Sequence, residues 1–293
     1  MVDISAISQV LAGGLLLGVL WGVVALGLNL IFGVMRVINL AHGEFLMLGA
    51  FLTLELQLQF GIHPFIGIFL LIPVFFVLGL VTHYLVIERI IKTENAELMS
   101  LLATFALLLI MQNVGRAIWS TDTEAIQDEF ISQTVNVFGV GVSYARVFSI
   151  VVAIVTMVLL YVIATKTEFG YAMRATVQNR QMAEVAGINT RRVYFITFGI
   201  SVVLAGLAGS MVGMIYPFTV NVGFSFVVMG FLVIVFGGMG SFVGAMAGAL
   251  VLGMIGSTGA YFFGSGARDL ILLGILVVTL FVKPDGVFGE ARV

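Results

Sequence analysis

The sequence predicts a polytopic α-helical membrane protein, and three observations support that fold class. Hydrophobic residues make up 61% of the 293 residues and charged residues only 10%, against about 25% charged residues in soluble domains. The mean hydropathy is +1.19. The apolar runs are continuous rather than alternating, which disfavours a membrane β-barrel. We therefore expect an all-α fold with one transmembrane domain over residues 1–293.

Nine apolar runs lie along the chain, most of them near the roughly 20 residues that a helix needs to cross a bilayer. They fall near residues 7–34, 45–60, 64–87, 98–119, 145–165, 193–216, 224–239, 242–263 and 269–283. The seventh and eighth runs are short and rich in glycine, so both are not expected to cross fully. The sequence thus predicts eight or nine transmembrane helices, some of them short or broken. The first run is far longer than the apolar part of a signal peptide, which indicates a retained span.

The distribution of charge predicts the orientation of the spans, because Lys and Arg gather in cytoplasmic loops. Loop 166–192 holds five of the 13 basic residues, and loop 88–97 holds Arg89 and Lys92. Loop 120–144 holds four acidic residues and no basic one. We expect the first two loops to be cytoplasmic, the third to be external and the C-terminus to be cytoplasmic. Nine spans would place the N-terminus outside; eight would reverse it or make one hairpin re-entrant.

Several functional classes fit the composition poorly. The formal net charge is −2, so nucleic acid is not expected as a partner. Cysteine is absent, which excludes disulfides, zinc thiolate sites and iron–sulfur clusters. The histidines His42, His63 and His83 are scattered along the chain and supply no convergent set of catalytic or metal-binding groups. We expect neither an intramembrane enzyme nor a metal site.

The stretch MRVINLAHGEF, residues 35–45, places four strongly polar side chains between two apolar runs. If the stretch is helical, Asn39 and His42 share one face and Glu44 points away from it. One interpretation is a cytoplasmic turn, in which Arg36 follows the inside rule and Asn39 caps the next helix. The other places Asn39 and His42 beside the substrate path or its inner gate, with Glu44 paired to a neighbouring helix or a partner subunit, because such groups are costly in lipid.

Glycine spacing is the second signal. Small residues four apart allow close contact between membrane helices, and this spacing predicts helix packing at Gly14, Gly18, Gly22, Gly244 and Gly248. The run FGGMGS, residues 236–241, concentrates three glycines within four positions, and each of them weakens a helix. We expect a break there, either a hairpin turn or a non-helical piece that lines the substrate path, and its path residues would be Gly237, Gly238, Gly240 and Ser241.

Two weaker patterns leave alternatives open. Residues 32–49 align with residues 236–253 at an offset of 204, which indicates an internal repeat of the kind found in transporters or a coincidence among common small residues. Alternating valines in residues 134–144 favour a small external β-hairpin or an irregular loop.

The basic loop 166–192 contains the signals of a short helix. Asn179 is a favourable N-cap, and Gly187 suits the position after a helix end. Between them RQMAEVA gives about two turns with a modest apolar surface, and Asn189 or Thr190 can cap the next span. The pattern predicts either a cytosolic docking helix or an ordinary amphipathic loop helix.

Five motifs give the chain a family resemblance. They are VINLAHGEFLMLGAF, TEFGYAMRA, AEVAGINTRRV, VFGGMGSFVGAMAGALVLG and VKPDGVFG. In this order and spacing they resemble the H-type permease subunit of bacterial branched-chain amino acid ABC transporters, over nearly the whole chain. Such a subunit lies in the inner membrane and is not itself an enzyme.

The resemblance implies partners and a role for the short helix. It implies a second related permease, two cytosolic ATPases and an extracytoplasmic binding protein. The chain has no phosphate-binding loop, so ATP and Mg would be bound by the ATPases and no cofactor by this chain. The resemblance makes the short helix the coupling helix, and the expected contact residues are Arg180, Met182, Ala183, Glu184 and Gly187. The local sequence AEVAG departs from the usual Glu-Ala-Ala-then-Gly pattern.

The substrate remains open between related solutes. Branched-chain amino acids come first, with urea, amides or small carboxylates as the alternative within the same importer family. An ion-coupled secondary transporter is less favoured, because it would be expected to keep ionisable groups in several spans.

Overall fold

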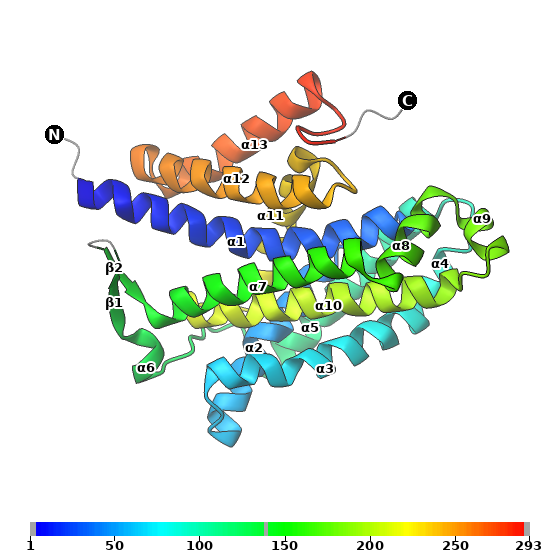
Figure 1. Ribbon diagram of the computed structural model, residues 1–293. Coiled ribbons are helices and arrows are strands. Elements are labelled where there is room, and N and C mark those ends of the chain that lie inside the picture. The colour runs from blue at the N-terminus through cyan, green and yellow to red at the C-terminus, as the bar shows by residue number, and fades with distance from the viewer. Residues whose placement is uncertain (1–3, 138–139, 290–293) are drawn as a thin grey trace.

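The computed structural model describes residues 4–137 and 140–289, and in these ranges the chain forms a bundle of helices with one two-stranded sheet (Figure 1). The elements are α1 (Ile4–Met35), α2 (His42–Phe60), α3 (Pro64–Thr82), the π-helical turn η1 (His83–Ile87), α4 (Glu88–Ile90), α5 (Ala96–Trp119), α6 (Glu129–Ser132), β1 (Thr134–Val137), β2 (Val140–Ser143), α7 (Tyr144–Lys166), α8 (Glu168–Gln178), α9 (Arg180–Val185), α10 (Thr190–Ile215), α11 (Val222–Gly237), α12 (Phe242–Phe263) and α13 (Ser265–Val282).

The predicted class of polytopic helical membrane protein is confirmed. Within the described residues, seven helices are long and apolar enough to cross a membrane: α1, α3 with its continuation to Ile90, α5, α7, α10, α12 and α13. The other two predicted runs form α2, whose 19 residues include Glu44 and Glu55, and α11, which has 16 residues. The eighth run was expected to be short, which is wrong, since α12 has 22 residues.

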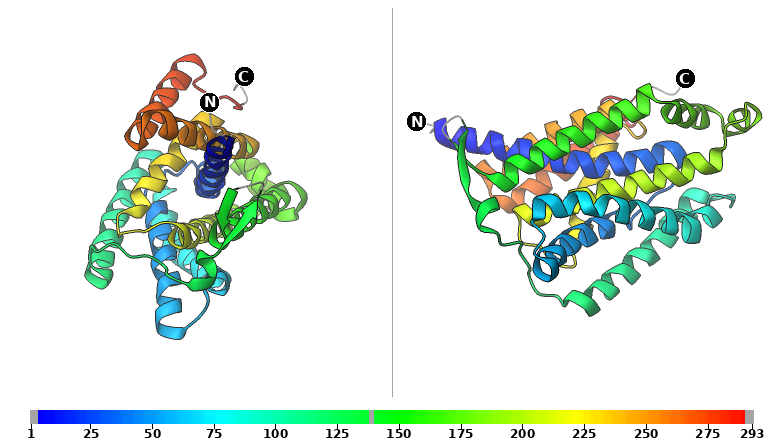
Figure 2. Two further views of the ribbon diagram at one scale, coloured as in Figure 1. Left: turned by 90° about the vertical axis from the view of Figure 1, so that its left-hand side faces the viewer. Right: turned by 60° about the horizontal axis from the view of Figure 1, so that its bottom comes forward.

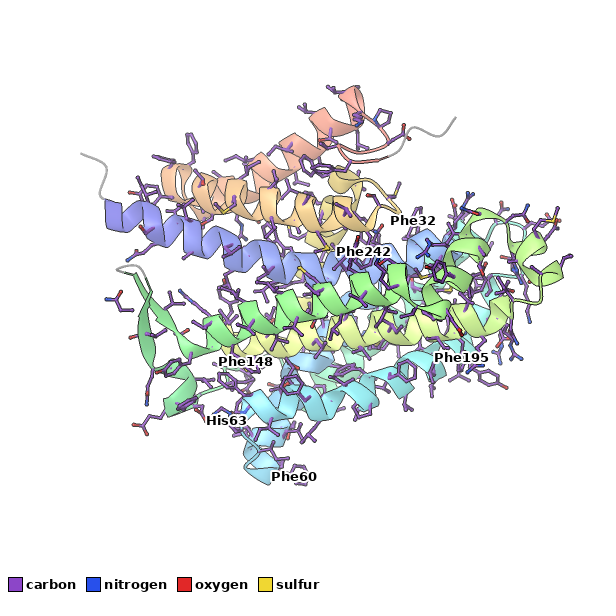
Figure 3. All side chains as sticks on the ribbon, in the orientation of Figure 1. Phe32, Phe60, His63, Phe148, Phe195 and Phe242 are labelled. Carbon is purple, nitrogen blue, oxygen red and sulfur yellow. The ribbon has the colours of Figure 1, made fainter. Side chains whose placement is uncertain are left out.

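The two ends of the bundle differ. The hairpin, α6 and the start of α1 lie at one end, called here the hairpin end, and α4, α8 and α9 lie at the other, called the α9 end (Figure 1). Loop 120–144 is thus separated from loops 88–97 and 166–192, as the charge pattern predicts. Among the side chains labelled in Figure 3, His63 and Phe148 lie toward the hairpin end and Phe195 toward the α9 end.

The β-hairpin is confirmed within the described residues. β1 pairs antiparallel with β2, with Thr134 opposite Ser143 and Val135 opposite Val142. The two residues predicted at its turn, 138 and 139, lie outside the described residues. Glu124 and Phe218 exchange two backbone hydrogen bonds of 2.9 Å, so the same loop is also attached to the chain after α10.

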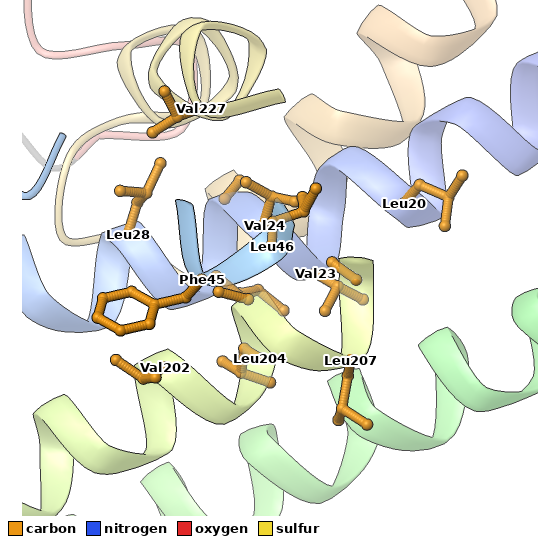
Figure 4. Packing of buried hydrophobic residues seen from close by; sticks show 14 of the residues in the cluster. Leu20, Val23, Val24, Leu28, Phe45, Leu46, Val202, Leu204, Leu207 and Val227 are labelled. Carbon is orange, nitrogen blue, oxygen red and sulfur yellow. The ribbon is translucent and has the colours of Figure 1, made fainter. Parts of the chain in front are cut away.

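The core lies where α1, α2, α10 and α11 meet. Leu20 and Val24 of α1, Phe45 of α2, Val202 of α10 and Val227 of α11 are all buried there (Figure 4). In contrast, α5 stands at the edge of the bundle (Figure 2), and α3, α7 and α13 also leave many apolar side chains exposed. This pattern is expected of helices that face lipid or a partner subunit.

Two parts of the chain repeat one arrangement in opposite directions. α1 ends at Met35 and α10 at Ile215, while α2 begins at His42 and α11 at Val222, so both boundaries recur after 180 residues. α1 and α10 run antiparallel through the bundle (Figure 1). The repeat predicted at an offset of 204 is therefore wrong, because it pairs the end of the 32-residue α1 with the end of the 16-residue α11.

Candidate functional site

The polar stretch is a buried, non-helical connection between α1 and α2. α1 ends at Met35, Arg36 adopts a positive φ of 53°, and the chain becomes helical again only at His42. Arg36 is exposed, whereas Asn39 is 1% exposed, so the connection enters the bundle after Arg36. The expected shared helical face is wrong, because Asn39 precedes the helix. Asn39 is also not the cap, since the N-cap is Ala41 and no side chain caps this end.

Side chains of α5 replace the missing helical hydrogen bonds of this connection. Ser100 Oγ accepts from the backbone N of Ile38 at 3.1 Å. Thr104 Oγ1 accepts from Leu40 N at 3.1 Å and donates to Ile38 O at 3.0 Å. Non-helical backbone that is buried away from water requires such partners. Ser100 and Thr104 are not among the predicted site residues, although their spacing of four in an otherwise apolar run is a usable signal.

His42 joins three helices at the start of α2. Its Nδ1 lies 3.4 Å from Ser201 Oγ of α10, and this hydroxyl donates to Gly27 O of α1 at 2.8 Å. A Cβ on Gly27 would lie 2.6 Å from the imidazole Cε1, so glycine makes room for the ring. His42 is fully buried, and it fixes the beginning of α2 between α1 and α10.

Glu44 points to the other side, toward α5, which confirms its predicted pairing with a neighbouring helix. Its Oε1 accepts from Gln112 Nε2 at 3.1 Å. Gln112 Oε1 accepts from Arg116 Nη2 at 3.4 Å, and Arg116 also donates to Asn221 Oδ1 at 3.1 Å. A polar chain therefore runs from the buried start of α2 to the residue before α11.

Several buried polar atoms near the start of α2 lack a partner among the described residues. They are both side-chain polar atoms of Asn39, Nε2 of His42 and Oε2 of Glu44. Leaving such groups unpaired in an apolar interior costs free energy, and most buried polar groups in proteins are paired. The concentration of these atoms in six residues marks the start of α2 as the candidate site.

The glycine-rich run forms a turn between α11 and α12. Gly238 and Gly240 both have positive φ, which glycine adopts without strain, and Ser241 caps α12 by accepting from Gly244 N at 3.1 Å. Asn29 of α1 holds the turn: its Nδ2 donates to Ser241 O at 3.0 Å, and its Oδ1 accepts from Gly240 N at 2.7 Å. Asn29 is not among the predicted site residues.

The structure does not bring the two predicted parts of the path into direct contact. His42 contacts Gly27 of α1, whereas the glycine turn contacts Asn29 and Gly33, farther along the same helix toward the α9 end. Instead, the start of α2 contacts the start of α11. A Cβ on Gly43 would collide with Gly223 O, and a Cβ on Gly223 would collide with Gly43 O.

The spaced glycines lie where helices pack. Gly14 and Gly18 lie against the backbone of α12, and Gly22 lies against Met157 of α7. Gly244 and Gly248 lie against Gly237 of α11. The close approach of α1, α11 and α12 depends on the absence of side chains at these positions.

The short helix of loop 166–192 is α9. Asn179 caps it by accepting from Met182 N, and Gly187 follows with a φ of 85°. Ala183 is 3% exposed, whereas Met182 is 67% and Val185 84% exposed. The apolar face that is free for docking thus consists of Met182 and Val185. Val185 belongs to the predicted apolar surface of RQMAEVA but not to the contact residues that the resemblance implies.

Glu184 stabilises the loop internally. Its Oε1 accepts from Thr190 Oγ1 at 2.6 Å and from Arg180 Nε at 3.1 Å. The hydrogen bond from Thr190, followed by that from Arg180, lowers the pKa of the Glu184 carboxyl below its ordinary value. Because both partners are in this chain, Glu184 connects α9 to the start of α10.

The match to a known protein family extends from α1 to α13. Residues 10–280 match the family described as branched-chain amino acid transport system, permease component. The chain belongs to this family. It is therefore a membrane-spanning permease component of a transport system and not itself an enzyme, as its resemblance implies. Among the described residues, no group of three or more His, Asp or Glu side chains is placed to hold a metal ion.

Curated relatives agree over nearly their whole length. The high-affinity branched-chain amino acid transport system permease protein BraD of Pseudomonas aeruginosa is 28% identical, with 97% of this chain and 96% of the relative covered. The corresponding LivH of Escherichia coli K12 is 28% identical over the same shares. The probable LivH of Methanocaldococcus jannaschii is 29% identical, with 96% and 92% covered.

One solved structure supports the fold. PsaBC from Streptococcus pneumoniae, in complex with Fab, aligns with a TM-score of 0.52 at 15% identity, covering 93% of this chain and 91% of that one. At this identity the likeness concerns the arrangement of helices alone.

Proposed function

We propose that this chain is the permease subunit of an ATP-driven importer that carries branched-chain amino acids into the cell. The observation that carries the proposal is the family match over residues 10–280, supported by relatives named as branched-chain amino acid permeases. Urea, amides and small carboxylates remain the alternative cargo.

The proposed partners are a second related permease, two ATPases that bind ATP and Mg, and a substrate-binding protein. The ATPase would dock at α9, where Met182 and Val185 are exposed. The binding protein would dock at the hairpin end. In this arrangement the protein lies in the inner membrane with the α9 end and the C-terminus in the cytoplasm, because the basic loops gather there.

The proposed path passes the start of α2 and then the glycine turn. Asn39 and His42 would offer hydrogen bonds to the passing solute, since Asn39 and the His42 Nε2 have no partner among the described residues. Gly237, Gly238, Gly240 and Ser241 would form the inner part of the path. Binding sites of transporters commonly lie where inverted repeats meet at broken helices, and the contact of α2 with α11 is such a place.

Reconstituted transport tests the function and the cargo. The complete transporter is placed in liposomes with its binding protein, and uptake of leucine, isoleucine and valine is compared with that of urea, acetamide and acetate. We expect ATP-dependent uptake of the three amino acids only. Uptake that follows an ion gradient without ATP would show a secondary transporter, and uptake of urea or acetamide alone would reject the proposed cargo.

Cysteine substitutions test the path, because the native chain has no cysteine. A water-soluble thiol reagent should label positions 39 and 42 in one transport state and not in another, and substrate should change the rate. Ala153, which is buried in α7, is the matched control that should stay unlabelled. If the cysteines introduced at positions 39 and 42 are never labelled, and transport survives Asn39→Leu and His42→Leu, these residues do not line the path.

Docking of the ATPase is tested at α9 without disturbing its fold. The double variant Met182→Asp with Val185→Asp should insert normally but lose most of the copurifying ATPase, since both side chains are exposed. Ala183→Trp is a poorer probe because Ala183 is buried and the substitution would displace α9 itself. Wild-type recovery of the ATPase with the double variant would place the docking surface elsewhere.

Docking of the binding protein is tested at the acidic loop. Asp128 is left unchanged, because it caps α6 through hydrogen bonds to Phe130 N and Ile131 N. Replacing Asp122, Glu124 and Glu129 with Ala should raise the concentration of binding protein needed for half-maximal ATPase stimulation, most clearly at low salt. An unchanged curve at low salt would reject this surface.

A further inference from the structure

A cavity at the α9 end has a composition that the proposed transport path does not explain. Its volume is about 650 Å³, within the roughly 300–1,000 Å³ typical of small-molecule sites. The end of α1, the glycine turn, the start of α5 and the segment after α13 surround it. A second cavity of about 600 Å³ adjoins it and shares Arg36 and Glu97. We call the first of these the inner cavity.

Three charged side chains line the inner cavity without neutralising one another. They are Arg36 at the end of α1, Glu97 in α5 and Asp285 after α13. Within residues 4–137 and 140–289, none of the three forms an ion pair or a side-chain hydrogen bond. One cation and two carboxylates are therefore available to a molecule that carries both signs of charge.

Arg36 occupies a position where glycine is the usual residue. Its φ is 53°, and its backbone N donates to Phe32 O at 2.8 Å, which ends α1 in the manner of a left-handed helix cap. Glycine would end the helix without strain. The arginine therefore adds strain to the helix end and in return places a guanidinium at the wall of the inner cavity.

The remaining wall suits an aliphatic group. Phe32, Val235 and Phe288 line the inner cavity together with Met239 and the backbone of the glycine turn. These apolar side chains form the smaller part of a mostly polar lining. The dimensions and the charges together fit a small zwitterion with a hydrocarbon side chain.

We propose that the inner cavity binds an aliphatic amino acid at the cytoplasmic end of the path, with its carboxylate on Arg36 and its ammonium group on Asp285 and Glu97. The hydrocarbon side chain packs on Phe32, Val235 and Phe288. This inference rests on the proposed function and adds a product-release site to it. Since all three charged residues are exposed, solvent screens the ion pairs, and the dissociation constant should be about 1 mM.

Ligand-observed NMR on the complete purified transporter, without nucleotide or binding protein, tests the site. Leucine should give a saturable signal. Leucinol lacks the carboxylate, and 4-methylpentanoate lacks the ammonium group, so each should bind about tenfold more weakly, as expected for losing one charge-assisted contact. Equal binding of the three compounds would overturn the zwitterion site.

Variants locate the binding. Arg36→Gly removes the guanidinium and also relieves the left-handed backbone, so a loss of binding is not explained by damage to the fold. Arg36→Gly and Asp285→Asn should each weaken leucine binding about tenfold. Arg36→Lys should retain much of it. Arg89→Gln, a change of the same charge in α4 outside the inner cavity, should leave binding unchanged.

The outcomes separate this inference from the proposed function. If wild-type liposomes import leucine but Arg36→Gly and Asp285→Asn leave leucine binding unchanged, the inner cavity is not the site and the transport function stands. If both variants instead lose the copurifying ATPase, the inner cavity is a protein contact and the inference is overturned. Absence of any branched-chain amino acid uptake by the wild type rejects the proposed function itself.

Discussion

The segment α1–α2–α3 and the segment α10–α11–α12 share a topology but differ in chemistry. Each has a long central helix, a non-helical connection and then a helix that begins inside the bundle. In the first segment the connection is tied to α5 by Ser100 and Thr104, and α2 begins with buried His42 and Glu44. In the second, the connection is tied to loop 120–144 through Phe218, and α11 begins with Val222 and Gly223.

The difference shows how one arrangement can serve two purposes. The first segment places ionisable groups at the meeting point of the two repeats, and the second supplies a nearly apolar helix that approaches through glycine. A polar group at membrane depth is tolerated where protein surrounds it, and the contact of Gly43 with Gly223 provides that enclosure. The polar groups therefore come only from the start of α2, and the start of α11 encloses them without adding polar side chains of its own.

The largest expected effect comes from the contact that the two segments share. Gly43→Val and Gly223→Val should each abolish accumulation of folded protein, because the added Cβ meets backbone that is fixed by a second helix, and overpacking costs about 1–3 kcal/mol or more. Gly274→Val in α13 is the control, since no atom lies within 4 Å of a Cβ there. Size-exclusion chromatography in mild detergent measures the outcome. A folded Gly43→Val protein would show that the two helices can separate freely.

The second expected effect tests whether only the first segment carries the polar function. His42→Leu should lower uptake more than tenfold while ATPase still copurifies. The lost contact between His42 Nδ1 and Ser201 Oγ should cost about 0.5–1.5 kcal/mol of stability, since Ser201 Oγ keeps its hydrogen bond to Gly27 O. The matched change in the second segment is Val222→Leu, which should leave uptake near wild type. Initial rates in liposomes, normalised to inserted permease, decide between them. Equal losses from both variants would make the segments functionally alike.

A smaller effect, on stability alone, is expected when the contact of Asn29 in α1 with the glycine turn between α11 and α12 is removed. Asn29→Leu removes both hydrogen bonds to the glycine turn, and the stability should fall by about 2 kcal/mol because Gly240 N and Ser241 O lose their partner. Thermal unfolding monitored by tryptophan fluorescence measures the loss, and Asn113→Leu on the exposed face of α5 serves as the control. An unchanged midpoint would mean that the turn holds its shape alone.

The smallest loss of stability is expected from removing the side-chain N-caps of α3 and α12. His63 accepts from Phe65 N at the start of α3, and Ser241 accepts from Gly244 N at the start of α12. Ser241→Ala should lower stability by about 1 kcal/mol. His63→Ala should have the smaller effect, because Pro64 already favours a helix start there. Chemical denaturation in mixed micelles compares the two, and a larger loss from His63→Ala would contradict this order.

The sequence predicts where the helices lie along the chain, but it does not predict which segments are buried inside the bundle. Long apolar runs give the spans directly, and Asn179 and Gly187 correctly bound α9, because caps depend on local backbone geometry. The buried connection before His42 is not predictable in this way. Its backbone partners, Ser100 and Thr104, come from a helix whose position is set by tertiary packing, so local patterns cannot show that the polar stretch lies inside the bundle.

The candidate site shows the same division. Residue type alone marks His42 and Glu44 as unusual in a membrane, and the helical spacing correctly turns Glu44 away from His42. The roles of Ser201 and Asn29 cannot be predicted from the sequence, because each acts through a hydrogen-bond contact with a residue far along the chain. The repeat was misaligned for a related reason: glycine-rich runs recur wherever helices approach closely, and they do not record chain direction.

The polar start of α2 has a consequence for how the protein enters the membrane during synthesis. α2 packs against α10, and the ring of His42 is enclosed by Gly27 and Ser201, yet Ser201 leaves the ribosome long after α2. At a synthesis rate of about 5–20 residues per second, α10 is made many seconds after α2, and α2 lacks its packing partner during that time. A buried acidic residue costs at least about 2.5–3.5 kcal/mol in lipid, so α2 requires temporary shelter, at the translocon or beside an insertase, until α10 arrives. Biogenesis of this protein is therefore expected to depend on retention of early helices and not on their immediate release into the bilayer.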